Sequence, residues 1–193
     1  MKKKTILVEI RTAVTVIFVL VFMCCVLYPL VVWGIAQVLF PVQANGSLLK
    51  TGPNVIGSVL IAQPFTQAGY FHPRPSAANY DALTSGGSNI GPLSAPLFKQ
   101  VATRVAIYRA QNHLLPREPV PVDAVTASAS GLDPHISLEN ARLQANRVAQ
   151  ARGISAVTVQ NLIAHCTEHR QLGLFGEQRV NVLLLNRALE KIK

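Results

Sequence analysis

"TAVTVIFVLVFMCCVLYPLVVWGIAQVLF", residues 12–40, decides the architecture of this chain because it contains no charged side chain. The uncharged stretch continues to Leu49, and its central part is dominated by Val, Leu, Ile, Phe and Met. A helix needs about 20 such residues to cross a bilayer core, so this run is long enough to span it with some tilt. The sequence predicts one transmembrane helix over residues 13–40, and Pro29 is a site where it can kink.

The residues before the apolar run predict its orientation. They comprise four bases and one acid, namely Lys2, Lys3, Lys4, Arg11 and Glu9. The positive-inside rule therefore predicts a cytoplasmic N-terminus over residues 1–12, a hinge over 41–54 and an extracytoplasmic, periplasmic domain over 55–193. A cleaved signal peptide also starts with bases, but its apolar part covers only about 7–15 residues. The run here is roughly twice as long, so we expect the helix to be retained.

Composition limits the partners of the outer domain. The formal net charge of the whole chain is +9, and the bases are scattered along the chain instead of forming blocks. Scattered bases indicate a solvated surface, whereas a nucleic-acid interface gathers Lys and Arg on one face. We expect membrane lipid as a partner and no nucleic acid. Cys24 and Cys25 lie in the apolar run, which leaves Cys166 alone outside without a disulfide partner.

Beyond the hinge, the pattern predicts alternating strands and helices. Val55–Ala62 is rich in Val, Leu and Ile and predicts a buried strand. Val120–Ala127 predicts a second strand, which Pro121 would confine to a sheet edge. Helices with an apolar stripe are predicted to follow polar N-cap residues at Ser94, Ser137, Ser155 and Asn181. The predicted fold class is α/β: one N-terminal transmembrane helix followed by a single mixed α/β extracytoplasmic domain.

The stretch "GYFHPRPSAANYDALTSGGSNIGP", residues 69–92, has neither a helical nor a strand period. Its Gly and Pro content predicts an ordered loop of the kind that carries function. Within it, successive amides of Ser85–Asn89 can form an anion-binding nest, although no Lys or Arg lies beside them. The alternative interpretation is a tight turn, held by side chains such as Asn79 and Asp81 that bond local amides.

Other constellations give weak chemical signals. An outer enzyme would need a nucleophile, a base and an orienting acid, for which the candidates are Ser85 or Ser88, His72 or His135, and Asp81 or Asp133. His165 and His169 are four residues apart on a predicted helix, but a third metal ligand is not evident. We therefore predict neither catalytic residues nor a metal site. A free-standing solute-binding protein, which would use the loop as its pocket, is the other alternative.

Motifs along the whole chain, taken together, are similar to those of one known family. They are Gly57-Ser58, Leu60-Ile61, Gln63, Phe65, Tyr70-Phe71, Arg74-Pro75-Ser76-Ala77, Tyr80, the run from Ser85 to Pro92, Val122-Asp123, Thr126-Ala127-Ser128, the run from Ser130 to Ser137, Arg147-Val148-Ala149, Ala151-Arg152-Gly153, Gly176-Glu177, Arg179 to Leu183 and Leu185-Asn186. With them the chain resembles the C subunit of the Kdp potassium-transporting ATPase. His72 and Gln178 depart from the family's usual residues, and neither lies in the glycine–serine run.

The resemblance implies a non-catalytic subunit of a bacterial inner-membrane complex that imports potassium with high affinity. In that complex a channel-like A subunit selects potassium and a P-type B subunit hydrolyses ATP. The C subunit is described as a catalytic chaperone that assembles and stabilises the complex and raises the ATP affinity of the B subunit. An outer domain cannot meet cytoplasmic ATP, so a periplasmic cap or filter over the potassium entrance of the A subunit is the alternative.

The resemblance and the loop together give two sets of candidate site residues. We expect this chain to hold no cofactor by itself and to contact ATP only in complex with the B subunit. The candidates for such contact are Ser85, Gly86, Gly87, Ser88 and Asn89. The candidates for the partner interface are Arg74, Ser76, Tyr80, Asp81, Asp133 and His135.

Overall fold

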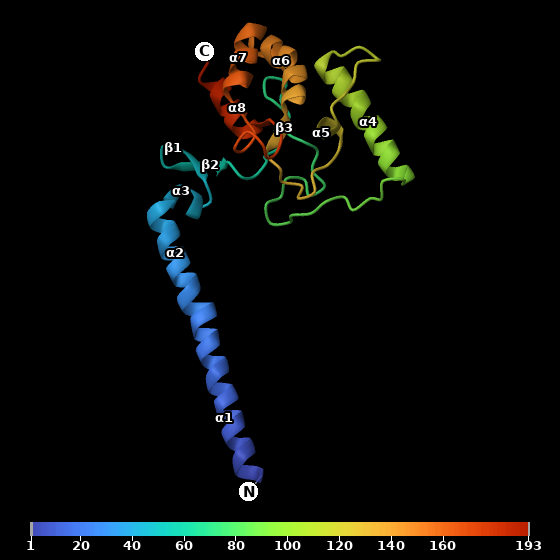
Figure 1. The fold of residues 1–193 in the computed structure, drawn as a ribbon. Coiled ribbons are helices and arrows are strands. Elements are labelled where there is room, and N and C mark those ends of the chain that lie inside the picture. Colours follow the sequence, from blue (N-terminus) through green and yellow to red (C-terminus); the bar gives the residue numbers. More distant parts are fainter. Residues whose placement is uncertain (1, 193) are drawn as a thin grey trace. The chain divides into compact units, whose positions relative to one another are not determined.

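The computed structural model describes residues 2–192 (Figure 1). It divides into two compact units, one that ends at Leu48 and one that begins at Leu49. The first unit consists mainly of a long helical run, and the second is a mixture of helices and short strands. A mixed α/β unit after one apolar N-terminal helix is the fold class that the sequence predicts.

The helical run of the first unit begins at Lys2 and contains a π-helical turn. It comprises α1 (Lys2–Val21), the π-turn Phe22–Leu27 and α2 (Tyr28–Leu39), followed by the short α3 (Pro41–Ala44). Residues Thr5–Leu39 are long and apolar enough to cross a bilayer. Proline lacks an N–H, and a π-turn changes the bonding pattern just before it. This register change accommodates Pro29 without ending the helix.

The strands of the second unit form two small sheets. β1 (Leu48–Thr51) pairs with β2 (Asn54–Ser58). The other sheet is antiparallel with the order β3-β5-β4, from β3 (His135–Ser137), β4 (Thr167–Glu168) and β5 (Arg179–Asn181). In it, Ile136 lies opposite Val180, which in turn lies opposite Thr167.

Two strand predictions fail in part or entirely. The strand predicted over Val55–Ala62 ends at Ser58, and its Val55 and Ile56 are exposed. In the described residues only β1 pairs with it, in a sheet of two strands. Val120–Ala127 contains the short helix α5 (Val122–Val125) instead of an edge strand. Pro121 stands at its N-cap, where a missing N–H costs nothing.

The helices of the second unit follow their predicted caps. They are α4 (Ala95–Asn112), α6 (Leu138–Arg152), α7 (Ala156–His165) and α8 (Val182–Glu190). The side chains of Ser137, Ser155 and Asn181 accept hydrogen bonds from the backbone N–H three residues later. Ser94 stands at the predicted N-cap of α4, but its Oγ makes no cap bond.

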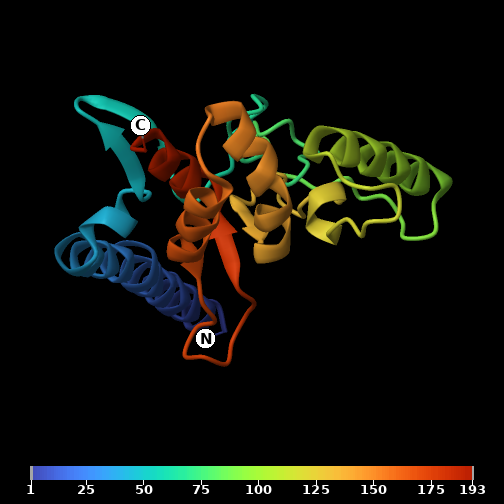
Figure 2. The same cartoon turned by 90° about the horizontal axis from the view of Figure 1, so that it is seen from above.

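Helices α6, α7 and α8 pack together to form the core, while α4 lies to one side of them (Figures 1 and 2). Small residues on α6, including Ala141 and Ala145, are fully buried and allow α7 to approach closely. The apolar side chains of α8 complete the core from the other direction, with Leu185 and Leu189 at 0% exposure. Phe71, which comes from the loop, is also fully buried. The loop is therefore part of the core at its beginning.

Candidate functional site

The loop Gly69–Pro92, called here the anchored loop, is attached to the core by two buried amides. Asn186 on α8 accepts a bond from the N–H of Phe71 at 2.8 Å and donates one to its carbonyl at 3.0 Å. Gln144 on α6 accepts from the N–H of His72 at 2.7 Å and donates to its carbonyl at 3.2 Å. Each amide thus replaces a strand neighbour for one residue of the loop.

A buried arginine holds the segment just before these amides. Arg147 on α6 is 5% exposed. Its Nη1 donates to the carbonyls of Ala68 at 2.6 Å and Tyr70 at 2.9 Å. Its Nε donates to Asn112 on α4, and none of the described carboxylates forms an ion pair with it. Burial lowers the pKa of Arg147 to about 10, against a smaller opposing effect of Tyr108.

Ser76 fixes the next turn of the anchored loop. Its Oγ donates to the carbonyl of Gly131 at 2.6 Å and accepts from the N–H groups of Ala78 and Tyr80. Tyr80 has a positive φ of 58°, a conformation that is uncommon outside glycine. Its hydroxyl donates to the carbonyl of Arg74 at 2.8 Å and closes the turn. Asp81 bonds the N–H of Leu83 and the hydroxyl of Thr84 within its own turn, as the tight-turn interpretation predicts.

Arg74, Asp133 and His135 form a chain of polar contacts that joins the anchored loop to the three-stranded sheet. Arg74 Nη1 lies 2.9 Å from Asp133 Oδ2, and His135 Nδ1 lies 3.3 Å from Asp133 Oδ1. His135 Nε2 is 3.7 Å from Glu168, which also pairs with Arg179. Burial raises the pKa of Asp133, but hydrogen bonds from His135 and Arg74 outweigh it and lower the value to about 2.

The glycine–serine run packs directly against the loop before β3. Ser85 Oγ and the N–H of Gly86 both donate to the carbonyl of Ser130, at 3.1 and 2.9 Å. A Cβ at Gly87 would lie 2.9 Å from the carbonyl oxygen of Ala129. Gly86 needs neither a positive φ nor extra space, although both glycines are alike in the sequence. Ser88 and Asn89 are exposed, and Asn89 has a φ of 51°.

These contacts bear on both chemical interpretations of the run. One amide of the proposed nest, that of Gly86, already has an acceptor inside the protein. The nearest guanidinium of the loop, Arg74, is already paired with Asp133, and its Nε is buried without a partner. The enzyme alternative needs a serine bonded to a histidine, but Ser85 bonds a carbonyl. These contacts fit a packed structural element better than a phosphate cradle or a nucleophile.

The histidine pair that the sequence places on one helix is divided by the structure. Helix α7 ends at His165, and His169 lies beyond β4. Within residues 2–192 no group of three or more His, Cys, Asp or Glu side chains could hold a metal ion. The helix prediction for His169 is therefore wrong.

Sequence reasoning missed the buried polar residues that hold the anchored loop. These are Gln144 and Asn186, which bond His72 and Phe71, and Arg147, which bonds Ala68 and Tyr70. A signal was present, because Gln144 lies three residues after Ala141 and Arg147 two after Ala145, close to the inward face of α6. A polar residue near an apolar helical stripe indicates a buried partner. The partner itself lies on a segment without any period, so the sequence does not reveal it.

Comparison with known proteins agrees with this arrangement of motifs. The family model described as "K+-transporting ATPase, c chain" (KdpC) matches residues 10–191. The chain belongs to the KdpC family. It is 52% identical over 186 residues to the potassium-transporting ATPase KdpC subunit of Mycobacterium bovis, covering 95% of this chain and 98% of that protein.

Further KdpC relatives come from distant bacteria. The subunit of Rhodospirillum rubrum is 52% identical over 186 residues, covering 94% of this chain and 95% of that protein. The subunit of Myxococcus xanthus is 50% identical over 190 residues, covering 97% of this chain and 88% of that protein. The resemblance inferred from the motifs is therefore confirmed over nearly the full length.

Proposed function

We propose that this chain is a non-catalytic subunit of an ATP-driven potassium import complex in a bacterial inner membrane. Its partners would be the channel-like A subunit and the ATP-hydrolysing B subunit. Membership of the KdpC family and the candidate span Thr5–Leu39 support this proposal. The bases before the apolar run favour a cytoplasmic N-terminus, which puts the second unit in the periplasm.

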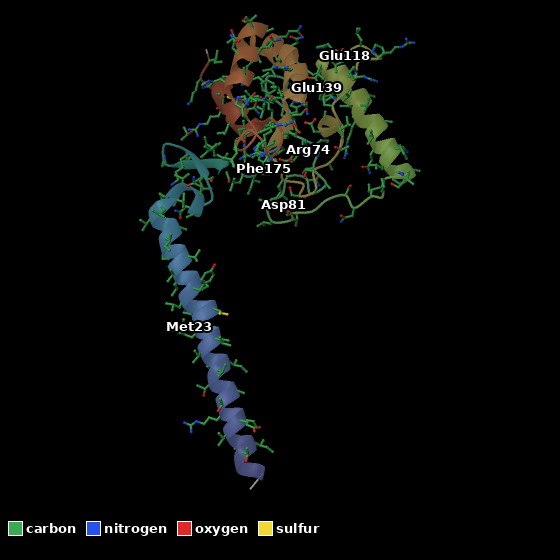
Figure 3. The ribbon with its side chains drawn as sticks, in the orientation of Figure 1. Met23, Arg74, Asp81, Glu118, Glu139 and Phe175 are labelled. Atoms are coloured by element: carbon green, nitrogen blue, oxygen red, sulfur yellow. The ribbon has the colours of Figure 1, made fainter. Side chains whose placement is uncertain are left out.

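The observation that carries the proposal is that polar side chains of the anchored loop bond to other residues of the same protein. Arg74, Ser76 and Ser85 all bond to residues of the segment Ser130–Asp133. The loop is thereby held in one shape, and it presents large apolar side chains to solvent, with Leu83 93% exposed and Leu93, the second residue after Gly91, 89% exposed just beyond the loop. Figure 3 shows Asp81 at the periphery of these loops and Arg74 nearer the helices. A fixed loop with exposed leucines suits docking to a partner.

The same contacts argue against direct ATP binding by this chain alone. A triphosphate is normally held by a cation as well as by backbone amides. The run Ser85–Asn89 contains no cation, and its Gly86 amide is occupied. We infer that any effect on the ATP affinity of the B subunit acts through assembly. A cap over the potassium entrance stays a prediction from the resemblance.

A pair of glycine substitutions tests the docking role. Gly87→Ala places a Cβ 2.9 Å from the Ala129 carbonyl and should shift the loop, whereas Gly86→Ala meets nothing within 4 Å. We expect Gly87→Ala to lower the amount of A and B subunits that co-purify with the chain in detergent, and to reduce potassium uptake. Gly86→Ala should behave like wild type. Equal recovery of partners by both variants, with both chains folded, would contradict the proposal.

A further inference from the structure

A short apolar tip extends from the second unit between β4 and β5. It consists of residues 171–176, and its Leu172, Leu174 and Phe175 are 88%, 76% and 64% exposed. Figure 2 shows this segment projecting beyond the helices as an orange-red loop, and Figure 3 labels Phe175 on it. Leu83 in the anchored loop and Leu93 just after it are ten residues apart, whereas the tip gathers three large apolar side chains within four residues.

Hydrogen bonds within the backbone of the tip hold it in one shape. Gln171 and Phe175 exchange two backbone hydrogen bonds, each 2.9 Å long. The turn between them needs left-handed backbone at Leu172, with a φ of 53°, and at Gly173, with a φ of 73°. A leucine in this conformation is uncommon and costs energy. The turn nevertheless exposes Leu172 to solvent, so packing in the core does not explain why a leucine occupies this position.

Paired charges border the tip. Arg170 contacts Glu177 at 2.7 Å, and Arg179 contacts Glu168 at 2.9 Å. The charges nearest the apolar side chains are therefore already paired. Moving the tip out of water leaves no unpaired charge in an apolar environment. The long arginine stems can also keep their heads at a polar surface while the tip lies deeper.

The size of the tip and the length of the tether decide between lipid and protein as the occupant. A stable protein interface buries about 800 Å² on each partner, and three such side chains offer roughly 500 Å². A tip of this size is too small to hold a protein partner by itself. Only residues 40–48 separate the candidate span from the second unit, and nine residues reach at most about 30 Å even when fully extended. A tethered tip meets the bilayer at high effective concentration, so a small apolar area is enough.

We propose that residues 171–176 insert into the interfacial layer of the same bilayer that the N-terminal helix spans. The tip is then a second membrane contact, which the family assignment does not include. This proposal depends on the candidate membrane span and does not depend on the proposed subunit role. The partners of Leu172, Leu174 and Phe175 are the acyl-chain ends nearest the headgroups, while the paired arginines and glutamates stay at the polar headgroup level.

Tryptophan fluorescence of the full chain tests this, because Trp33 in α2 is the only tryptophan in the sequence. The chain is reconstituted in vesicles of phosphatidylcholine and phosphatidylglycerol whose acyl chains carry bromine near the headgroup. The test variant combines Trp33→Phe with Phe175→Trp. The matched control combines Trp33→Phe with Leu115→Trp, a site that is 72% exposed between α4 and α5. Wild-type Trp33 reports on the span.

We expect the test variant to be quenched at least about twofold more than the control, because an interfacial aromatic ring lies at the depth of the bromine. Adding Leu174→Asp should abolish the difference. Equal quenching of test and control would overturn the proposal. So would a tip that becomes shielded only when the other subunits are present, since its occupant would then be protein. Unquenched Trp33 would show that the N-terminal helix does not span the bilayer, and this would also overturn the proposal that the tip inserts. The co-purification test of the subunit role would not be affected by that result.

Discussion

The anchored loop and the helical core are stabilised in different ways. In the core, Ala141, Ala145 and Val148 recur at helical spacing on α6, and Ser137 and Asn181 cap α6 and α8. The loop has no period, and its shape depends on side chains far away in the sequence. Asn186 is 115 residues from Phe71, and Gln144 is 72 residues from His72. The core helices are therefore specified locally, whereas the shape of the loop depends on side chains that the core helices supply.

The largest effect is expected where the two regions join. Arg147→Met removes the donors that satisfy the carbonyls of Ala68 and Tyr70 and the side chain of Asn112. Buried acceptors left unpaired should lower the free energy of unfolding of the second unit by about 3–5 kcal/mol. Urea unfolding of the full chain in detergent, followed by circular dichroism, measures this change.

The matched control is Arg142→Met, an exposed arginine on the same helix. It should change the free energy of unfolding by less than about 0.5 kcal/mol. Equal effects of the two substitutions would show that the buried arginine does not join the loop to the core.

A core substitution should have the next largest effect. Leu185→Ala removes a side chain with 0% exposure from the contact of α8 with the core. The lost burial and the remaining cavity should cost about 2–4 kcal/mol in the same unfolding experiment. Ala188, half-buried on the same helix, offers the comparison, because Ala188→Gly loses little burial and about 1 kcal/mol of helix propensity. A cost for Leu185→Ala no greater than that of Ala188→Gly would mean that α8 is not a core helix.

A substitution confined to the anchored loop should cost less. Ser76→Ala removes three hydrogen bonds of one hydroxyl, including the donation to Gly131. The loop can relax toward solvent, so we expect a loss of about 1–2 kcal/mol in stability. Ser88→Ala, at an exposed serine of the same loop, should be neutral. Similar values for both would indicate that the loop is not held by Ser76.

The last expected effect, from the titration of Asp133, is confined to acidic pH. Its pKa is lowered from 3.8 to about 2, so its stabilisation is present above pH 3.8 and is lost as the pH falls toward 2. The stability difference between wild type and Asp133→Asn should therefore shrink over this acidic range. Unfolding at a series of pH values measures it, and Asp81→Asn serves as control because Asp81 bonds only its own turn. A difference that is constant across the range would contradict the lowered pKa.

The sequence predicted much of the core but only the position of the site. Helices that begin after Ser137, Ser155 and Asn181 were predictable because cap and period lie within one segment. The strand over Val120–Ala127 was wrong because short apolar runs do not distinguish a strand from a helical turn.

The candidate site was harder to predict for a physical reason. The contacts of Arg74 with Asp133 and of Ser76 with Gly131 join segments more than 50 residues apart, and nothing local encodes them. The different roles of Gly86 and Gly87 depend on the position of Ala129 and were equally hidden. The tight-turn role of Asp81 was predictable because the donors that bond its carboxylate lie within its own turn.

Hydrogen–deuterium exchange over residues 69–93, the anchored loop and the residue after it, tests most directly whether the loop docks to a partner or binds nucleotide. It is measured on the full chain alone, on the chain with ATP, and on the chain assembled with the A and B subunits. We predict that exchange slows in the assembled complex, particularly around Leu83 and Leu93, and that ATP alone leaves Ser85–Asn89 unchanged. Slower exchange of Ser85–Asn89 with ATP alone, or unchanged exchange in the complex, would contradict the account.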